Sequence, residues 1–286
     1  MPECTVHLIA RQAGTPPSDF FKQLKLDIED HRLPYIVKGK PCGWVHRPHT
    51  LQAEQLTGHD WDIFLLADYK ELPSRVAGSV SAHVSVTVDI PDDQYDKLVA
   101  AIDQSPSVAP ETPELPADWS PFKPGVRIDA DPSGVIPEKT IVEAKDGSLD
   151  VGELRLDRRM ADFLTNAEPR DIRGSPICYF NLFKYKNGDR SVHDSYMEGF
   201  KNKFGPAAGA QIKFMGPVQG QLKYEGEQGK ATSDKEGKWD DANLVQYHSV
   251  WHYAYMLSTD VYKELNKEKV SGLDDTCILL VSELGV

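Results

Sequence analysis

The sequence of 286 residues predicts an α+β fold built from two similar modules. Three observations lead to this prediction. The C-terminal part shows strand and helix patterns in the order of a split β-α-β unit, the N-terminal part shows a similar order, and a proline-rich stretch lies between them. A chain of this length exceeds one typical domain and fits two modules of about 100 residues each.

The N-terminal module begins with a strand and a helix whose start is marked by Ser18, a good capping residue. Phe20, Leu24 and Ile28 recur at helical spacing and form the predicted buried stripe of this helix. The elements expected in this half are a strand at 5–10, a helix from 18, strand pieces at 35–37 and 43–46, strands at 61–66 and 82–88, and a helix at 92–102.

Eight prolines between Ser105 and Gly152 predict an extended connector, because repeated proline prevents helices and central strands. Trp119, Phe122 and Ile128 are expected to anchor it to the surface, and residues 154–163 predict a short helix after it. The expected boundaries are therefore 1–104 for the first module, 105–174 for the connector and short helix, and 175–286 for the second module.

The C-terminal module is organised around residues 244–258, which begin as a strand and continue as a helix. Leu244, Gln246 and His248 share one face of the strand, and helical spacing begins near Trp251. Around this stretch we expect a strand at 178–185, a helix at 194–204, a strand at 211–222, the strand and helix over 244–265, and a last strand at 276–284. Residues 224–239 have no apolar period and predict a loop that can cover a pocket.

Four segments of this module resemble the dimeric α/β-barrel superfamily. They are Cys178–Tyr185, Tyr196–Phe200, Tyr247–Ser249 and Leu257–Tyr262. They are most similar to fungal two-module proteins whose second half resembles a domain-of-unknown-function (DUF1330-like) family. The resemblance implies two ferredoxin-like modules packed as an intrachain, pseudo-dimeric α/β barrel with a pocket. It implies no particular reaction, and it allows a monomer or a homodimer.

Composition restricts the class of partner. The net charge of −12 and the isoelectric point near 5.2 argue against binding to nucleic acid or to an anionic membrane. No basic and apolar leader pattern and no membrane-spanning apolar run is evident, and four scattered cysteines fit a reducing compartment. We therefore expect a cytoplasmic protein whose partner is a small molecule.

The histidine spacing does not predict a metal site. His248 and His252 are four residues apart and His46 and His49 are three apart, but no carboxylate lies between either pair. Nucleotide-binding glycine motifs and G-x-S-x-G are absent too. We expect no metal and no organic cofactor. One alternative comes from the resemblance, since some two-module relatives bind haem through a histidine in the second module, here His252.

The strand 178–185 has one polar and one apolar face. The polar face carries Tyr179, Asn181 and Tyr185, and the apolar face carries Cys178, Phe180 and Leu182. We expect the apolar face under the helices and the polar face inside the barrel, where it lines a cavity with Gln246 and either His248 or Tyr247. The alternative is that these polar groups only satisfy one another in the barrel centre.

The expected chemistry is acid–base catalysis, with His248 as the catalytic base or acid and with Tyr179 or Asn181 stabilising an oxyanion. The expected ligand-binding residues are Tyr185, Gln246, Tyr247, Trp251, His252, His7 and His83, with the last two facing each other across the N-terminal sheet.

Two functions stay open. One is a cofactor-independent enzyme for cyclisation, isomerisation, decarboxylation or oxygenation of a hydrophobic oxygenated molecule, and the other is a non-catalytic small-molecule-binding or stress-associated protein.

Overall fold

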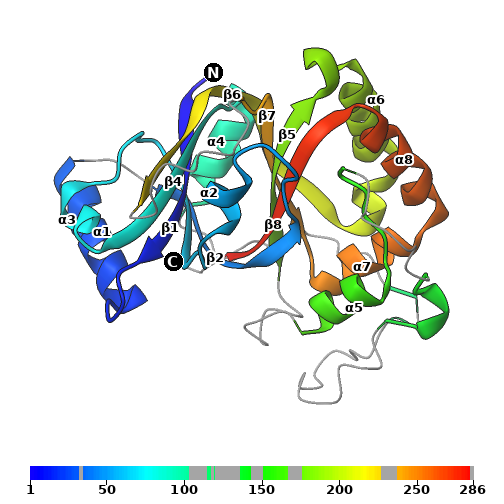
Figure 1. Ribbon diagram of the computed structural model, residues 1–286, viewed down its shortest axis with the longest axis horizontal. Coiled ribbons are helices and arrows are strands. Elements are labelled where there is room, and N and C mark those ends of the chain that lie inside the picture. The colour runs from blue at the N-terminus through cyan, green and yellow to red at the C-terminus, as the bar shows by residue number, and fades with distance from the viewer. Residues whose placement is uncertain are drawn as a thin grey trace.

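The computed structural model describes residues 1–31, 35–102, 115–116, 119, 136–142, 151–166, 176–226 and 237–283. Its framework is a closed barrel of antiparallel strands in the order β1-β3-β2-β8-β5-β7-β6-β4 (Figure 1). The strands are β1 (Glu3–Arg11), β2 (Tyr35–His46), β3 (Ile63–Ala67), β4 (Val80–Asp89), β5 (Ile177–Tyr185), β6 (Ala210–Gly226), β7 (Asp241–Tyr247) and β8 (Leu273–Glu283). The predicted α+β class is confirmed.

Each half of the chain supplies four neighbouring strands of the barrel. The N-terminal half contributes the run β4-β1-β3-β2 and the C-terminal half the run β6-β7-β5-β8. Numbered within its own half, each run has the order 4-1-3-2 when both are read in the same direction around the barrel. The repeated order of elements expected from the sequence therefore recurs in the strand pairing.

The two halves meet along two seams, where β2 pairs with β8 and β4 pairs with β6. A glycine lies at each seam. A Cβ atom added at Gly216 would overlap the backbone oxygen of Asp89, and one at Gly39 would overlap a methyl group of Val281. Only glycine permits such a close approach of neighbouring strands, so these two positions contribute to barrel closure.

The barrel interior is filled by apolar side chains from both halves. Phe64 from the first half packs edge-on against Phe180 from the second, with ring centroids 5.5 Å apart. Other buried members of this cluster are Val6, Leu8, Val84, Val86, Cys178, Leu182, Phe214, Trp239, Leu244, Leu279 and Val281. This core holds the two sheets together through the burial of apolar surface.

The face assignment made from the sequence is wrong for β5. Cys178, Phe180 and Leu182 point into the barrel, whereas Tyr179 packs on the helix-covered side. The reason is that the inner face of each sheet meets the other sheet and excludes water, so it must be apolar. Tyr179 and Asn181 therefore lie on the outer face, beneath the helices, where Asn181 bonds to Asn243 on the neighbouring strand.

Helices cover the outer faces of the two sheets, with α1 and α3 at one end of the molecule and α5 to α8 beside β5 to β8 at the other (Figure 1). The N-terminal helices are α1 (Pro17–His31), α2 (Ala53–Thr57), α3 (Ser74–Ala77) and α4 (Asp92–Ala100). The C-terminal helices are α5 (Arg158–Thr165), α6 (Ser191–Gly199), α7 (Val250–Ser258) and α8 (Asp260–Ser271). No helix in the described ranges is both long and apolar enough to cross a membrane.

Most expected elements are found, with shifted ends. The strand pieces at 35–37 and 43–46 form one strand with register shifts, and β6 continues to Gly226 inside the predicted loop. Phe20 and Leu24 are buried as expected, and Trp119 packs edge-on against Tyr255. The side chain of Ile28, together with Phe122, Ile128, most of the connector and residues 227–236, lies outside the described structure.

The helix expected to continue to residue 265 breaks at Thr259. This residue ends α7, and its hydroxyl accepts a hydrogen bond from the backbone N–H of Tyr262, which caps the start of α8. Val261, in the first turn of α8, is 54% exposed. The break turns α8 so that a different set of residues faces the sheet.

Replacing Gly216 by valine should destabilise the protein by at least about 2 kcal/mol, because the new side chain overlaps backbone at the β4–β6 seam. Urea unfolding followed by circular dichroism measures the change. The matched control is Gly78→Ala, which adds a methyl group in open space and should change stability by less than about 0.5 kcal/mol. Equal effects of the two substitutions would contradict the role assigned to the seam.

Candidate functional site

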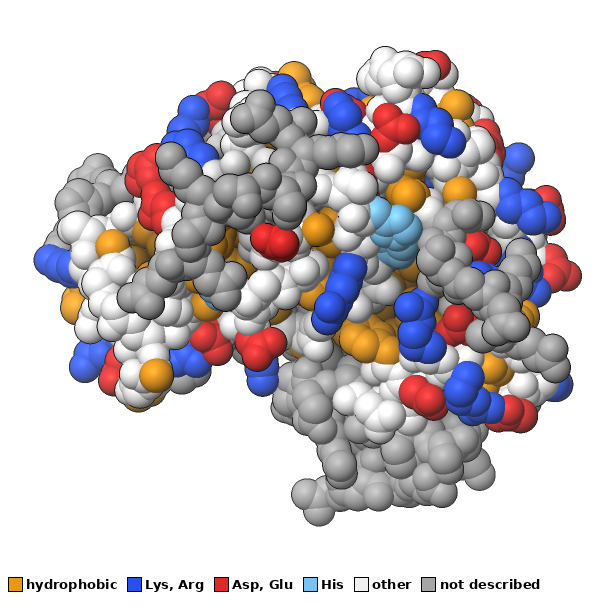
Figure 2. Space-filling view, in the orientation of Figure 1, with side chains coloured by type: hydrophobic (Ala, Val, Ile, Leu, Met, Phe, Trp, Pro, Cys, Tyr) orange, Lys and Arg blue, Asp and Glu red, His pale blue; other side chains and the backbone are white. Residues whose placement is uncertain are grey.

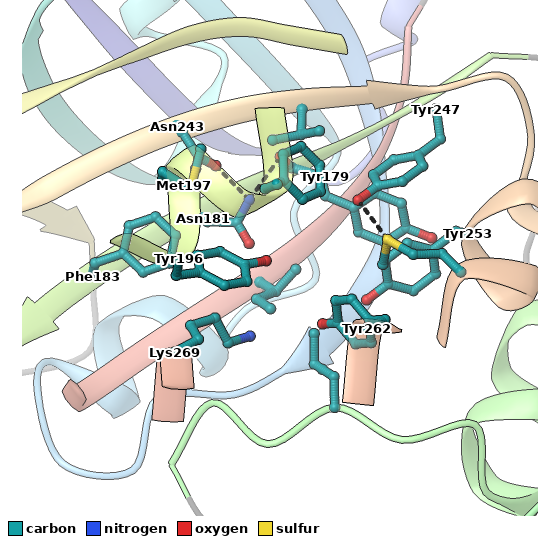
Figure 3. A pocket seen from close by; sticks show the side chains of 15 residues that line it. Tyr179, Asn181, Phe183, Tyr196, Met197, Asn243, Tyr247, Tyr253, Tyr262 and Lys269 are labelled. Atoms are coloured by element: carbon teal, nitrogen blue, oxygen red, sulfur yellow. Dashed lines mark hydrogen bonds between the residues drawn. The ribbon is translucent and has the colours of Figure 1, made fainter. Parts of the chain in front are cut away.

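A cavity of about 40 Å³ lies between the outer face of β5, β7 and β8 and the helices α6, α7 and α8 (Figure 3). This volume is enough for two or three water molecules or a small organic group. Five tyrosines from five elements line it, namely Tyr179, Tyr196, Tyr247, Tyr253 and Tyr262. Tyrosine hydroxyl groups therefore line the cavity, although apolar side chains of the core surround it.

The five tyrosines are held as neutral phenols. Burial raises the pKa of each hydroxyl far above its ordinary value, so each can donate a hydrogen bond but does not ionise near neutral pH. Tyr179 and Tyr253 stack with ring centroids 4.0 Å apart. Their buried hydroxyls have no hydrogen-bond partner among the described residues. A ligand oxygen would satisfy these donors.

Among the described residues that line the cavity, Lys269 is the one with a basic side chain. Its side chain comes from the last turn of α8 and the residue is 4% exposed. Burial lowers the pKa of its amine from 10.5 to about 7, since removal from water penalises the charged form. Burial also lowers the pKa of the nearby His46 to about 4 and that of His193 to about 3, so both are neutral at pH 7 and add no positive charge beside the amine.

Two asparagines on neighbouring strands fix the polar wall of the cavity opposite α8. The amide nitrogen of Asn181 donates to Asn243 Oδ1 at 2.6 Å and to the backbone oxygen of Tyr179 at 3.1 Å. Its amide oxygen is thereby turned away from Asn243. Figure 3 shows that this oxygen, the Lys269 amine and the hydroxyls of Tyr196 and Tyr262 point toward a common space.

A larger groove of about 420 Å³ adjoins the cavity on the side of α8, between that helix and residues 153–156. Leu154 lines both spaces. Its backbone oxygen accepts a hydrogen bond from Asn266 Nδ2 at 3.3 Å, and Asn266 Oδ1 accepts one from the Tyr262 hydroxyl at 3.4 Å. Leu154 is thus the partition between the groove and the cavity.

The structure brings together only part of the predicted site. Tyr179, Asn181 and Tyr247 line the cavity, although on the helix-covered side of the sheet rather than inside the barrel. Tyr247 donates its hydroxyl to the sulfur of Met256 at 3.2 Å, a weak acceptor. Gln246 instead lies opposite Cys178, on the side of the strand that faces the barrel interior.

His248, Trp251 and His252 form a separate group around the start of α7. The His248 and His252 rings are 5.3 Å apart, and the Ser249 hydroxyl caps the helix and contacts His252 Nδ1 at 2.9 Å. None of them is among the described residues that line the cavity. Burial, and to a smaller extent the neighbouring His252, lowers the pKa of His248 below its ordinary value.

Tyr185 lies at the far end of β5 from the Tyr179 stack. Its hydroxyl donates to Asp241 Oδ2 at 2.6 Å and contacts His193 Nδ1 at 2.9 Å, while Arg190 pairs with Asp241. Because the hydroxyl hydrogen goes to Asp241, the His193 nitrogen must donate to the tyrosine oxygen. This network connects α6 to the sheet.

His7 and His83 face each other in the N-terminal half, as expected. His7 Nδ1 and His83 Nε2 are 2.9 Å apart, and His7 Nε2 contacts the backbone oxygen of Tyr69 at 3.1 Å. Burial lowers the pKa of His7 to about 3 and also lowers that of His83. The pair lies in the N-terminal half, whereas the cavity belongs to the C-terminal half.

The described residues contain no cluster of three or more His, Cys, Asp or Glu side chains that could hold a metal ion. The expectation that no metal or organic cofactor takes part stays a prediction. The alternative with haem on His252 also stays a prediction; in the structure His252 is 8% exposed and its Nδ1 contacts the Ser249 hydroxyl at 2.9 Å. On the face shown in Figure 2, acidic and basic side chains are interspersed.

No family model matches the sequence, and no curated protein matches it. Similar solved structures include RPA0582, a protein of unknown function from Rhodopseudomonas palustris, at 19% identity and a TM-score of 0.30, over 39% of this chain and 85% of that chain. Another is a "putative monooxygenase" from Lactobacillus acidophilus NCFM, at 7% identity and a TM-score of 0.41, over 99% of this chain and 98% of that chain. Structural similarities with such low sequence identity and TM-score do not identify an activity.

Sequence reasoning missed Lys269, Tyr253 and Tyr262. A signal for Lys269 exists in α8, where Tyr262, Asn266 and Lys269 follow one another at helical spacing and are all buried. A lysine on the buried stripe of a helix is unusual, because lysine is almost never fully buried unless it is paired.

The stability of the wild type should rise with pH, relative to Lys269→Met, between about pH 7 and pH 10. The folded lysine titrates near 7 and the unfolded one near 10.4, so the unfolded state binds more protons in this window. The cost of burial is therefore largest below about pH 7 and declines as pH rises, by at most about 1.4 kcal/mol per pH unit. Urea unfolding across this range measures it.

Lys267→Met is the matched control, because Lys267 lies on the same helix and is exposed. It should leave the slope of stability against pH unchanged. Parallel slopes for wild type and Lys269→Met would show that the buried amine keeps its ordinary pKa.

Proposed function

We propose that this protein is a cofactor-independent enzyme that acts on a small, largely apolar, oxygenated molecule in the cavity beneath α6, α7 and α8. One observation carries the proposal. The cavity combines a buried amine that titrates near neutral pH with neutral phenol donors that lack described partners. A perturbed pKa next to converging polar groups in a closed pocket is typical of active sites.

The proposed chemistry is proton transfer. An amine with a pKa of about 7 exchanges protons readily at neutral pH, and neutral tyrosine hydroxyls can donate to the oxyanion of an enolate or phenolate. Isomerisation, ring closure and decarboxylation all pass through such an anion. Lys269 takes the acid–base role first assigned to His248, and Tyr179 and Asn181 keep the oxygen-binding roles expected from the sequence.

We also propose that each half is a ferredoxin-like module and that the barrel is the intrachain form of the dimeric α/β-barrel arrangement. The 4-1-3-2 strand order in each half supports this proposal, as does the closure of the barrel by two inter-half seams. The boundaries 1–104, 105–174 and 175–286 belong to the same proposal, as do the DUF1330-like assignment and a cytoplasmic location. A monomer suffices for such an intrachain barrel.

A non-catalytic ligand-binding protein is the second candidate, because the same cavity and donors would bind an oxygenated compound without transforming it. The two functions differ at Lys269. In an enzyme, Lys269→Met abolishes turnover of a ligand that still binds. In a binding protein no ligand is turned over, whatever residue stands at this position.

Removal of single hydroxyls should weaken ligand binding without harming the fold. Tyr179→Phe and Tyr253→Phe each delete a donor that has no described partner, so stability should stay the same or rise slightly. Affinity for an oxygenated ligand, identified by ligand-observed NMR from a panel of small carbonyl and phenolic compounds, should fall by about threefold to tenfold. The control His248→Gln, outside the cavity, should bind normally.

Two results would contradict the placement of the site. One is a loss of binding in His248→Gln with binding retained in both tyrosine variants. The other is the failure of every compound in the panel to produce a signal that depends on Tyr179 or Tyr253.

A further inference from the structure

We propose that Lys269 captures a small uncharged aldehyde or ketone by forming an imine with it inside the cavity. This inference rests on the proposed function, since it names the substrate class of the same site. It goes further in assigning a covalent step to one nitrogen atom.

The position of Lys269 is the first support. The side chain enters the cavity from α8, and its amine faces the space shared with the hydroxyls of Tyr196 and Tyr262 (Figure 3). Burial lowers the pKa of its amine, and no carboxylate among the described residues offsets this effect. An amine that is neutral in a substantial fraction of molecules is a nucleophile, whereas an ammonium group is not.

The other lysines of α8 show the contrast. Lys263 Nζ lies 2.8 Å from Asp260 Oδ1 and Lys267 Nζ lies 2.7 Å from Glu264 Oε1, and both lysines are exposed to solvent. An amine of pKa about 7 is about half neutral at pH 7, whereas one of pKa about 10.4 is neutral in roughly one molecule in 2,500. The lowered pKa therefore makes a far larger fraction of Lys269 nucleophilic than that of a lysine with the ordinary value.

The lining also selects the class of carbonyl compound. Apart from Lys269 and the tyrosines, the described lining contains amides and apolar side chains. If the amine is consumed in an imine, no other described cation of the lining remains to pair with a substrate carboxylate. The occupant is thus an uncharged molecule, or an uncharged carbonyl end, small enough for a cavity of about 40 Å³.

The step balances without any further reactant. The lone pair of the neutral amine attacks the carbonyl carbon, a C–N bond forms, and the C=O π bond breaks. The oxygen, held by a tyrosine hydroxyl, ends as the hydroxyl of a carbinolamine after taking a proton that the nitrogen loses. The C–O bond then breaks, water leaves with the second N–H proton, and a C=N bond remains. No oxidation or reduction occurs, and water is the only by-product.

The imine makes the adjacent carbon acidic, because its protonated form accepts the electron pair released when a proton leaves. This links covalent capture to the proton-transfer chemistry of the proposed function. A simple acid–base role for Lys269 would need no bond to the substrate, so the two roles can be separated by experiment.

The test is reductive trapping of the whole wild-type protein with propanal and sodium cyanoborohydride near pH 7, followed by digestion and mass spectrometry. Cyanoborohydride supplies the hydride that converts the imine to a stable propylamine. We expect propylation at Lys269 at a rate at least about tenfold above that at Lys263 or Lys267, because its amine has a lowered pKa and lies in the cavity, whereas the other two amines are held in ion pairs. The selectivity should disappear in urea, where all three lysines are exposed to solvent.

Ligand-observed NMR with propanal alone, on wild type and on Lys269→Arg, separates the possible failures. Trapping at Lys269 no faster than at Lys263 and Lys267, with propanal still bound in a manner sensitive to Tyr253→Phe, would overturn the imine and leave the proposed function standing. If propanal is neither trapped at Lys269 nor bound in the cavity, the result counts against both the imine and the proposed function. Circular dichroism of Lys269→Arg establishes that loss of trapping is not loss of fold.

Discussion

The closure of the barrel is the constraint on which the rest of the structure depends. When β2 pairs with β8 and β4 with β6, the inner faces of the two sheets meet and exclude water. Polar side chains on the inner faces would then lose hydration without gaining partners, at a cost of about 1–3 kcal/mol each. The apolar filling of the barrel follows, and the cavity lined by Asn181, Lys269 and the five tyrosines lies on an outer face, beneath the helices.

The buried polar side chains on the outer faces are arranged differently in the two halves of the chain. In the N-terminal half, His7 and His83 satisfy each other and the backbone. In the C-terminal half, Lys269 and the Tyr179–Tyr253 stack surround a small cavity. A buried amine without an ion pair costs stability, and buried hydroxyls without partners add to that cost. Natural proteins retain such costs mainly where a functional site requires them.

The sequence was sufficient to predict the strands and their order along the chain, but not to locate the site. Alternation in residues 178–185 and 244–247 defines two faces, and both are buried in the structure. Alternation alone cannot tell which buried face meets a sheet and which meets helices, so Tyr179 and Asn181 were assigned to the wrong side. Lys269 was missed because the break at Thr259, which orients α8, depends on a hydroxyl cap rather than on apolar periodicity.

The most direct measurement is an NMR titration of the Lys269 amine in protein labelled with ¹³C at the lysine Cε atoms, with the signal assigned from its absence in Lys269→Met. The structure predicts a midpoint near pH 7 and a signal well separated from those of exposed lysines such as Lys267. A midpoint near the ordinary lysine value of about 10.4 would mean that water reaches the amine in solution. In that case the cavity beneath α6, α7 and α8 would not be the buried reactive site proposed above.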